Sequence, residues 1–184
     1  HKEIMRVRLF LFTLVHLISQ VAIAESSPAI RVLIEKNQKV VSLKGRKITC
    51  PNLHQARFPK NTLNLTQNMV AKNLLCFAEQ YPFQANHQWV WGPLQIIPQK
   101  NGLEFVAQIP LEQYLLGVVQ SEMHAKWPLE TLKAQAVAAR TYALSKMRQS
   151  SQARYDVVST TGDQVYKSNF TPHPQVAKAV RKTQ

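Results

Sequence analysis

Residues 110–123 carry the clearest pattern of apolar and polar positions in the chain. Their apolar residues recur at i, i+1, i+4, i+5 and i+9, the spacing of one face of an α-helix that begins near Pro110. These residues are Tyr114, Leu115, Val118, Val119 and Met123. Glu122 falls on the same face, four residues after Val118 and three after Val119. The pattern predicts an amphipathic helix with one carboxyl group on its apolar face.

That carboxyl group has two explanations. An ionised carboxylate on an apolar face is costly unless it is paired, whereas a protonated carboxyl is what a general acid needs. Alternatively, Glu122 lies at the edge of the face and meets a Lys or Arg from the next helix. Spacing alone leaves both interpretations open.

A second helical pattern covers residues 128–149. Pro128 suits the first position of a helix, and Glu130 in the first turn is favourable to the helix dipole. The apolar positions here are mostly small, which allows another element to approach closely. They are Leu129, Leu132, Ala136, Ala139 and Ala143.

The N-terminal half of the chain reads as mostly β. We expect strands over residues 29–35, 40–43 and 47–50, the first two paired, with a turn at 44–46. Residues 51–88 contain several prolines and many Asn and Gln residues, and predict loops with a short helix around 69–80. A strand pair or bent strand is expected over 89–97. Asn101-Gly102 is a hairpin signal that leads into a strand over 103–109.

After the helices, residues 155–160 read as a strand, 161–163 as a turn and 164–167 as a returning strand. The predicted fold class is therefore α+β, with a β-rich N-terminal part followed by a two-helix segment and a short β-hairpin.

Three motifs, YLLGVVQSEM (114–123), WPLETLKAQAVAARTYAL (127–144) and YDVVSTTGDQVY (155–166), resemble the stage II sporulation protein D family, also called the SpoIID/LytB domain. The similarity covers roughly residues 30–183. The family includes lytic transglycosylases that cut peptidoglycan glycan strands, and relatives that enhance a cell-wall amidase. Glu122 matches the catalytic glutamate of its Glu-Met motif, which makes the two helices the expected catalytic segment. The usual proline of that motif is replaced here by His124.

The resemblance also implies substrate-binding residues. Lys133 and Arg140 are seven positions apart on one helix face and would offer two cations to the carboxylate of N-acetylmuramic acid. The alternative is an exposed basic face, or an ion pair with Glu122 or Glu130. Gln135 and Tyr142 are likewise seven apart on a different stripe and are also expected to bind substrate.

Gln164 and Tyr166 match the family's Gln-x-Tyr segment. They are expected to hydrogen-bond acetamido groups or to stack on a sugar ring, with a core position for Tyr166 as the alternative. The expected function is a lytic transglycosylase that cleaves bonds from N-acetylmuramic acid to N-acetylglucosamine with Glu122 as its single acid/base. The alternative is a non-catalytic wall-binding enhancer of an N-acetylmuramoyl-L-alanine amidase.

Residues 5–24 have the features of a secretory signal: Arg6 and Arg8, an apolar region, and Ala22-Ile23-Ala24 as a cleavage site. With the few residues before Met5, this predicts a signal peptide over 1–24 and the SpoIID/LytB-like domain over 25–184. The expected location is the periplasm or cell envelope, with no stable membrane span after signal cleavage. The family's later groove segment is missing after Gln184, so we expect a domain truncated at its C-terminus.

The formal net charge of +13 suits an anionic partner. Cell-wall polymers are expected and nucleic acid is not, since no recognisable nucleic-acid module occurs. In an exported chain Cys50 and Cys76 are expected to form a disulfide, with two free thiols as the alternative. Neither has a second cysteine at metal-ligand spacing, and the Cys and His metal site of some family members is not matched. We therefore expect no metal and no cofactor.

Overall fold

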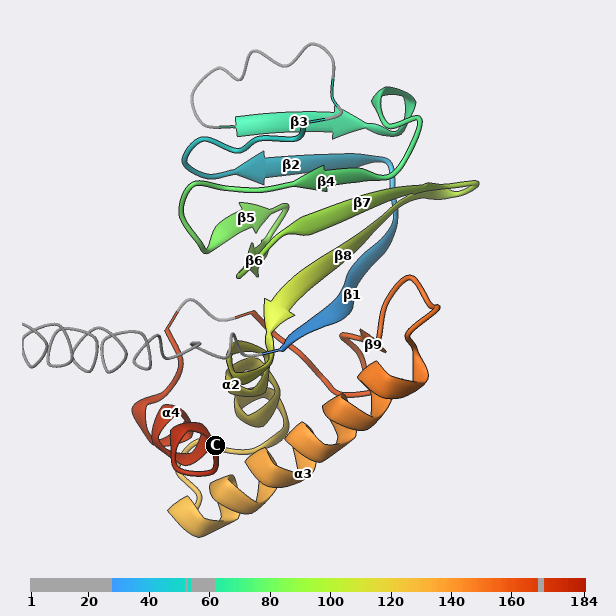
Figure 1. The fold of residues 1–184 in the computed structure, drawn as a ribbon. Helices are drawn as coiled ribbons and strands as arrows, with labels where there is room; N and C mark the ends of the chain where they lie inside the picture. Colours follow the sequence, from blue (N-terminus) through green and yellow to red (C-terminus); the bar gives the residue numbers. More distant parts are fainter. Residues whose placement is uncertain (1–27, 52, 54–61, 169–170) are drawn as a thin grey trace, which may run out of the picture.

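Two β-sheets and a group of helices make up the protein in the computed structural model, which describes residues 28–51, 53, 62–168 and 171–184. Figure 1 shows the helices gathered at one end of the sheets, where the long strands β1 and β8 meet α2. This arrangement confirms the α+β class. The predicted signal peptide lies outside the described residues. Among those residues, no helix is long and apolar enough to cross a membrane.

The larger sheet has the strand order β4-β7-β8-β1-β9. Its central strands are β1 (Ala29–Gln38) and β8 (Gly102–Pro110), which pair antiparallel from Ala29↔Pro110 to Gln38↔Leu103. The predicted hairpin at Asn101-Gly102 is confirmed, since it joins β7 (Leu94–Gln99) to β8. Gly102 has φ +146, and a Cβ there would lie 2.7 Å from the Asn37 carbonyl carbon, so the turn requires glycine.

The second sheet has the order β3-β2-β5-β6, and it corrects the expected pairing of residues 29–35 with 40–43. Strand β2 (Val40–Lys44) pairs instead with β3 (Thr62–Thr66) and β5 (Phe83–Ala85). Strand β1 is already bonded to β8 on one edge and to β9 on the other. The expected single strand or pair over 89–97 is likewise divided, because β6 (Gln88–Val90) and β7 lie in different sheets.

The helix expected around residues 69–80 is wrong. A 3-10 turn (η2, Gln67–Met69) is followed by strand β4 (Leu74–Cys76), which pairs with β7 and buries both its end residues. Sheet pairing and burial outweigh the local pattern here. The strand expected over 47–50 reduces to one bridge between Thr49 and Phe77. Next to that bridge, Cys50 and Cys76 form a disulfide with an S–S distance of 2.09 Å.

The two predicted helices are confirmed as α2 (Leu111–Glu122) and α3 (Leu129–Gln149). Pro110 and Pro128 each stand just before the first helical residue, so Pro128 is the cap and not the first position. Four apolar residues of α2 are fully buried: Tyr114, Leu115, Val118 and Val119. The small face of α3 is buried against them at Leu132, Ala136, Ala139 and Ala143, while Leu129 is half-buried.

The short hairpin expected after the helices is wrong. Only Val157–Val158 (β9) forms a strand, and it pairs parallel to β1 rather than with residues 164–167, which have no regular structure. A further helix, α4 (Pro174–Arg181), was not predicted. It packs against both α2 and α3 through Val176, Ala179 and Val180. The described residues that follow β9, 159–168, therefore run past α2 and α3 without joining a sheet.

Candidate functional site

Glu122 is the last residue of α2, and its side chain is exposed. Of the two interpretations left open by the sequence, the one that places Glu122 among the buried residues of the apolar face is therefore wrong. The apolar face of α2 reaches the protein surface at the last turn of the helix, and Met123, directly after it, is only half-buried. Glu122 lies at the edge of the apolar face, as the alternative interpretation proposed, but its partner is not a Lys or Arg.

Two neutral donors hold the Glu122 carboxylate. The Gln135 side-chain Nε2 on α3 donates to Oε2 at 2.7 Å, and the Val165 main-chain N–H donates to Oε1 at 3.2 Å. Three separate segments therefore meet at this carboxylate: the end of α2, the first half of α3, and the returning segment 163–167. Glu122 is fixed in orientation while remaining accessible from solvent.

Asp163 fixes the start of the returning segment. Its Oδ1 accepts from the Tyr142 hydroxyl at 2.6 Å and from the Lys146 ammonium at 2.7 Å, and its Oδ2 accepts from the Val158 N–H at 2.8 Å. Partial burial opposes ionisation of Asp163, but these three donors outweigh it and hold the pKa of the carboxyl below its usual value. Tyr142, expected to bind substrate, is thus a partner of Asp163.

Gln164 and Tyr166 are both buried, at 6% exposure each. The Gln164 Oε1 accepts from the Tyr114 hydroxyl at 3.1 Å, and the rings of Tyr114 and Tyr166 stack with centroids 5.2 Å apart. Burial is the main cause that raises the pKa of both tyrosines, with the charges of Asp163 and Glu122 adding to the shift at Tyr114. Tyr166 takes the core position that was the alternative to a sugar-stacking role.

Glycine at position 117 allows this approach. A Cβ on Gly117 would lie 2.5 Å from the Tyr166 Cε2 and 2.7 Å from the Lys167 carbonyl oxygen. Neither distance is tolerated, so the returning segment packs on α2 only because that residue has no side chain.

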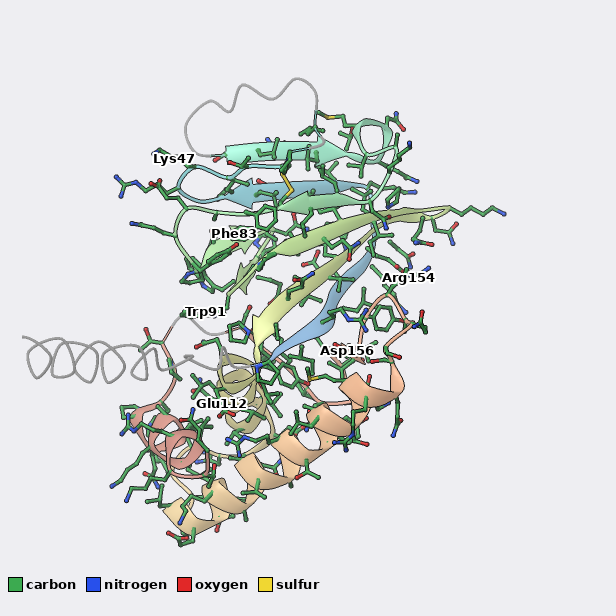
Figure 2. The ribbon with its side chains drawn as sticks, viewed as in Figure 1. Lys47, Phe83, Trp91, Glu112, Arg154 and Asp156 are labelled. Carbon is green, nitrogen blue, oxygen red and sulfur yellow. A yellow bond between two sulfur atoms is a disulfide. The ribbon has the colours of Figure 1, made fainter. Side chains whose placement is uncertain are left out.

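Arg140 does not face Glu122, which corrects the expected pair of groove cations. Its Nε and Nη2 donate to the two oxygens of Glu112 on α2 at 2.8 and 2.7 Å, and its Nη1 donates to the Thr183 carbonyl at 3.0 Å. Figure 2 shows Glu112 on α2, on the side that faces α4. Arg140 therefore joins three helical segments. Lys133 pairs with Glu130 at 2.8 Å on its own helix, as the structural alternative proposed.

Sequence reasoning gave no role to Asp156, which is also buried. It accepts from the Arg31 Nη2 at 2.6 Å and from the Ser150 hydroxyl at 2.5 Å, and so links β1 to the end of α3 (Figure 2). The signal in the sequence that could have pointed to Asp156 is a single carboxylate directly before two β-branched residues, Val157 and Val158. Its partner Arg31 is 125 residues away, which no local pattern reveals. No group of three or more His, Cys, Asp or Glu side chains with metal-binding geometry occurs among the described residues.

Comparison with known proteins agrees with the motifs around this site. Residues 99–184 match the SpoIID family model, described as Stage II sporulation protein. An uncharacterised protein of Brachyspira hyodysenteriae is 37% identical over 127 residues, which are 67% of this chain and 34% of the relative. The stage II sporulation protein D of Bacillus subtilis is 42% identical over 81 residues, 42% of this chain and 24% of the relative.

A protein of Bacillus subtilis named amidase enhancer is 45% identical over 69 residues, 38% of this chain and 9% of the relative. The chain spans about a third or less of the length of these relatives. The family match starts at the last residue of β7 and includes β8, α2, α3, the returning segment and α4. Gln135 and Val165, the two residues that donate hydrogen bonds to Glu122, both lie within it.

Proposed function

Because this chain belongs, through residues 99–184, to the SpoIID family of stage II sporulation proteins, we propose that it acts on the bacterial cell wall as a peptidoglycan lytic transglycosylase. The bond cleaved is that from N-acetylmuramic acid to N-acetylglucosamine, and Glu122 is the single acid/base. The protein works outside the cytoplasm, in the periplasm or cell envelope, where its substrate is found.

The observation that carries this proposal is the state of Glu122. It is exposed, so a polymer as large as a glycan strand reaches it, and it is oriented by two neutral donors rather than neutralised by a cation. A catalytic carboxylate must be both accessible and held in a fixed geometry. Each of the cations expected beside it has another acidic partner, namely Glu112 for Arg140 and Glu130 for Lys133.

The surroundings of Glu122 also favour a reaction that needs one carboxylate. A hydrolytic glycosidase uses two carboxyl groups on opposite sides of the scissile bond. Asp163 is the carboxylate on the segment that contacts Glu122, but both its oxygens are occupied by Tyr142, Lys146 and Val158. It is therefore a structural group and is not free to activate a water molecule.

In the reaction, protonated Glu122 gives its proton to the glycosidic oxygen as the bond from muramic C1 to that oxygen breaks. The C6 hydroxyl of the same muramic residue then bonds to C1 and gives its proton to the Glu122 carboxylate. A 1,6-anhydro ring is formed, no water is consumed, and Glu122 ends protonated, as it began. One exposed carboxyl group performs both proton transfers.

The test is mass spectrometry of the soluble products released from intact and amidase-stripped sacculi. The chain should release anhydro-ended glycan fragments, and Glu122→Gln should release none while still binding sacculi, because the amide cannot transfer the proton. Glu130→Gln is the matched control, since Glu130 is an exposed glutamate whose ion pair, among the described residues, is with Lys133 on its own helix. Equal cutting by parent and Glu122→Gln would refute the proposal.

The similarity to an amidase enhancer favours a second candidate, a non-catalytic protein that binds the wall and stimulates an N-acetylmuramoyl-L-alanine amidase. In that case sacculi bind, no anhydro fragments appear, and added amidase releases stem peptides faster. An unchanged amidase rate with and without the chain would exclude this candidate.

A further inference from the structure

The two oxygens of Glu122 have chemically different partners. Oε1 accepts from the main-chain N–H of Val165, and Oε2 accepts from the side-chain amide of Gln135. A main-chain N–H can only donate, so Oε1 cannot direct a proton towards it. A Gln side chain has a carbonyl oxygen beside its NH₂ group, so rotation by half a turn about its last bond presents an acceptor in place of a donor.

An acid/base residue needs a partner that tolerates both of its protonation states. With Gln135 Nε2 facing Oε2 at 2.7 Å, the pair fits the ionised carboxylate. With the amide reversed, the Gln135 oxygen accepts from a protonated Oε2. A Lys or Arg at position 135 would donate in both orientations and would support the ionised form alone.

We propose that Gln135 is a positioning residue that reverses its amide with the protonation state of Glu122, and that Oε2 is the oxygen that carries the transferred proton. This inference rests on the proposed transglycosylase function. In the cycle, the Oε2–H turns from the Gln135 oxygen to the glycosidic oxygen of the bound strand and gives its proton to it. The Gln135 amide then turns its NH₂ group to the carboxylate. Oε2 next takes the C6 hydroxyl proton, and the amide turns back.

Oε1 is held by a rigid donor throughout. Val165 follows directly after Asp163 and Gln164, whose side chains are bonded to α3 and α2 respectively. Both anchors keep the Val165 N–H in place whether Glu122 is charged or neutral. The carboxyl group is therefore fixed at one oxygen and adjustable at the other.

The other titratable groups around Glu122 keep their charge across the neutral range. They are Tyr114 on α2, Tyr142 and Lys146 on α3, and Asp163 and Tyr166 on the returning segment. Burial raises the pKa of all three tyrosines, with Asp163 adding to the shift at Tyr114 and Tyr142. Hydrogen bonds to Asp163 and Tyr142 raise the pKa of Lys146. His124 lies two residues after Glu122, and His124→Gln therefore serves as a control.

The first test is the pH dependence of glycan cleavage by Gln135→Met and Gln135→Lys. Gln135→Met keeps the length of the side chain without a strong hydrogen-bonding group, and we expect kcat to fall about tenfold with little change in KM. Gln135→Lys should move the pH optimum down by roughly one to two units, since only the ionised form is supported. Gln149→Met, a matched change at the exposed end of α3, should leave the profile unchanged.

The second test does not depend on activity. Carbon-13 NMR of the Glu122 carboxyl should show a titration midpoint that moves to lower pH in Gln135→Lys, while the Val165 amide keeps its protection from hydrogen exchange. The role of Gln135 would be overturned if the Glu122 titration midpoint is the same in Gln135→Lys and in the parent. It would also be overturned if their pH–rate profiles superimpose. If the parent chain cuts no glycan, the proposed function fails, and the NMR midpoint alone then decides whether Gln135 couples to the Glu122 proton.

Discussion

At the scale of the residue, Arg140 and Lys133 show that the acidic partner of a basic side chain decides whether it is free to bind substrate. Their spacing places them on one helix face, and the sequence therefore predicts a pair of substrate-binding cations. Each instead has an acidic partner, Glu112 or Glu130. The Glu112 partner lies 28 residues away from Arg140, on the preceding helix, so the spacing within α3 carries no information about it.

We expect Arg140→Met to act on stability rather than on substrate binding. The half-buried, bidentate pair with Glu112 should be worth about 2 kcal/mol in the free energy of unfolding, between exposed and fully buried ion pairs. Urea unfolding of Arg140→Met, Glu112→Gln and the double variant measures this coupling. If Arg140→Met keeps the stability of the parent but no longer binds sacculi, Arg140 is a substrate-binding residue after all.

Glu122 itself was predicted from the sequence, but its surroundings were not. Helical periodicity and the motif identify the residue, since both are local. Its contacts with Gln135 and Val165 join positions 13 and 43 residues away, and depend on how three segments pack. A fully apolar setting for Glu122, one of the two interpretations left open by the sequence, is wrong because α2 ends there.

At the scale of the element, the sequence predicts the two long helices α2 and α3 well but predicts strand partners poorly. The apolar faces of α2 and α3 recur within a few residues, so the sequence displays them. The partners of β1 are β8, more than 60 residues away, and β9, more than 110 residues away. Nothing in the sequence of residues 29–38 identifies β8 and β9, rather than the nearby β2, as the pairing partners of β1. The sequence predicts a returning strand over 164–167. Burial does alternate there, but these residues pair with no strand.

The packing of that segment on α2 gives a direct prediction. Gly117→Ala should destabilise the fold by roughly 1–3 kcal/mol, since the added methyl group meets the Tyr166 ring and the Lys167 carbonyl. Gly162→Ala is the control, because its Cβ would meet only side-chain atoms at longer distances, the Val158 Cγ2 at 3.2 Å and the Thr160 hydroxyl oxygen at 3.7 Å. Thermal unfolding compares the two, and equal melting temperatures would contradict the tight contact at Gly117.

The link from β1 to the end of α3 should depend on pH. Burial alone would raise the pKa of Asp156, but the hydrogen bonds from Arg31 and Ser150 outweigh it and keep the pKa below the usual 3.8. Because the folded-state pKa is the lower one, this carboxylate stabilises the fold above about pH 4 and loses that effect as pH falls further.

Asp156→Asn should therefore unfold more easily than the parent at pH 7. The difference in the free energy of unfolding should shrink steadily below about pH 4, where the parent carboxylate also becomes protonated. Denaturant unfolding at a series of pH values measures it. A difference that is constant with pH would mean that the ionised form of Asp156 is not what matters.

At the scale of the whole molecule, one hydrophobic core joins the sheets to the helices. The disulfide belongs to this core, whereas Glu122 lies outside it, exposed at the end of α2. Closing a loop of 26 residues, the Cys50–Cys76 bond should stabilise the fold by about 3 kcal/mol. A Cys50→Ala/Cys76→Ala variant should melt at a lower temperature but cut glycan at the parent rate where it is folded. Lost cleavage in the folded variant would tie the disulfide to the site.

The neutral donors at Glu122 have a consequence for ionic strength. Attraction between a chain of net charge +13 and an anionic wall is screened by salt, whereas hydrogen bonds from an amide and a main-chain N–H are not. Added salt should therefore weaken capture of the polymer and leave the chemical step unchanged. An envelope protein built in this way would lose substrate in a saline medium without losing its catalytic competence.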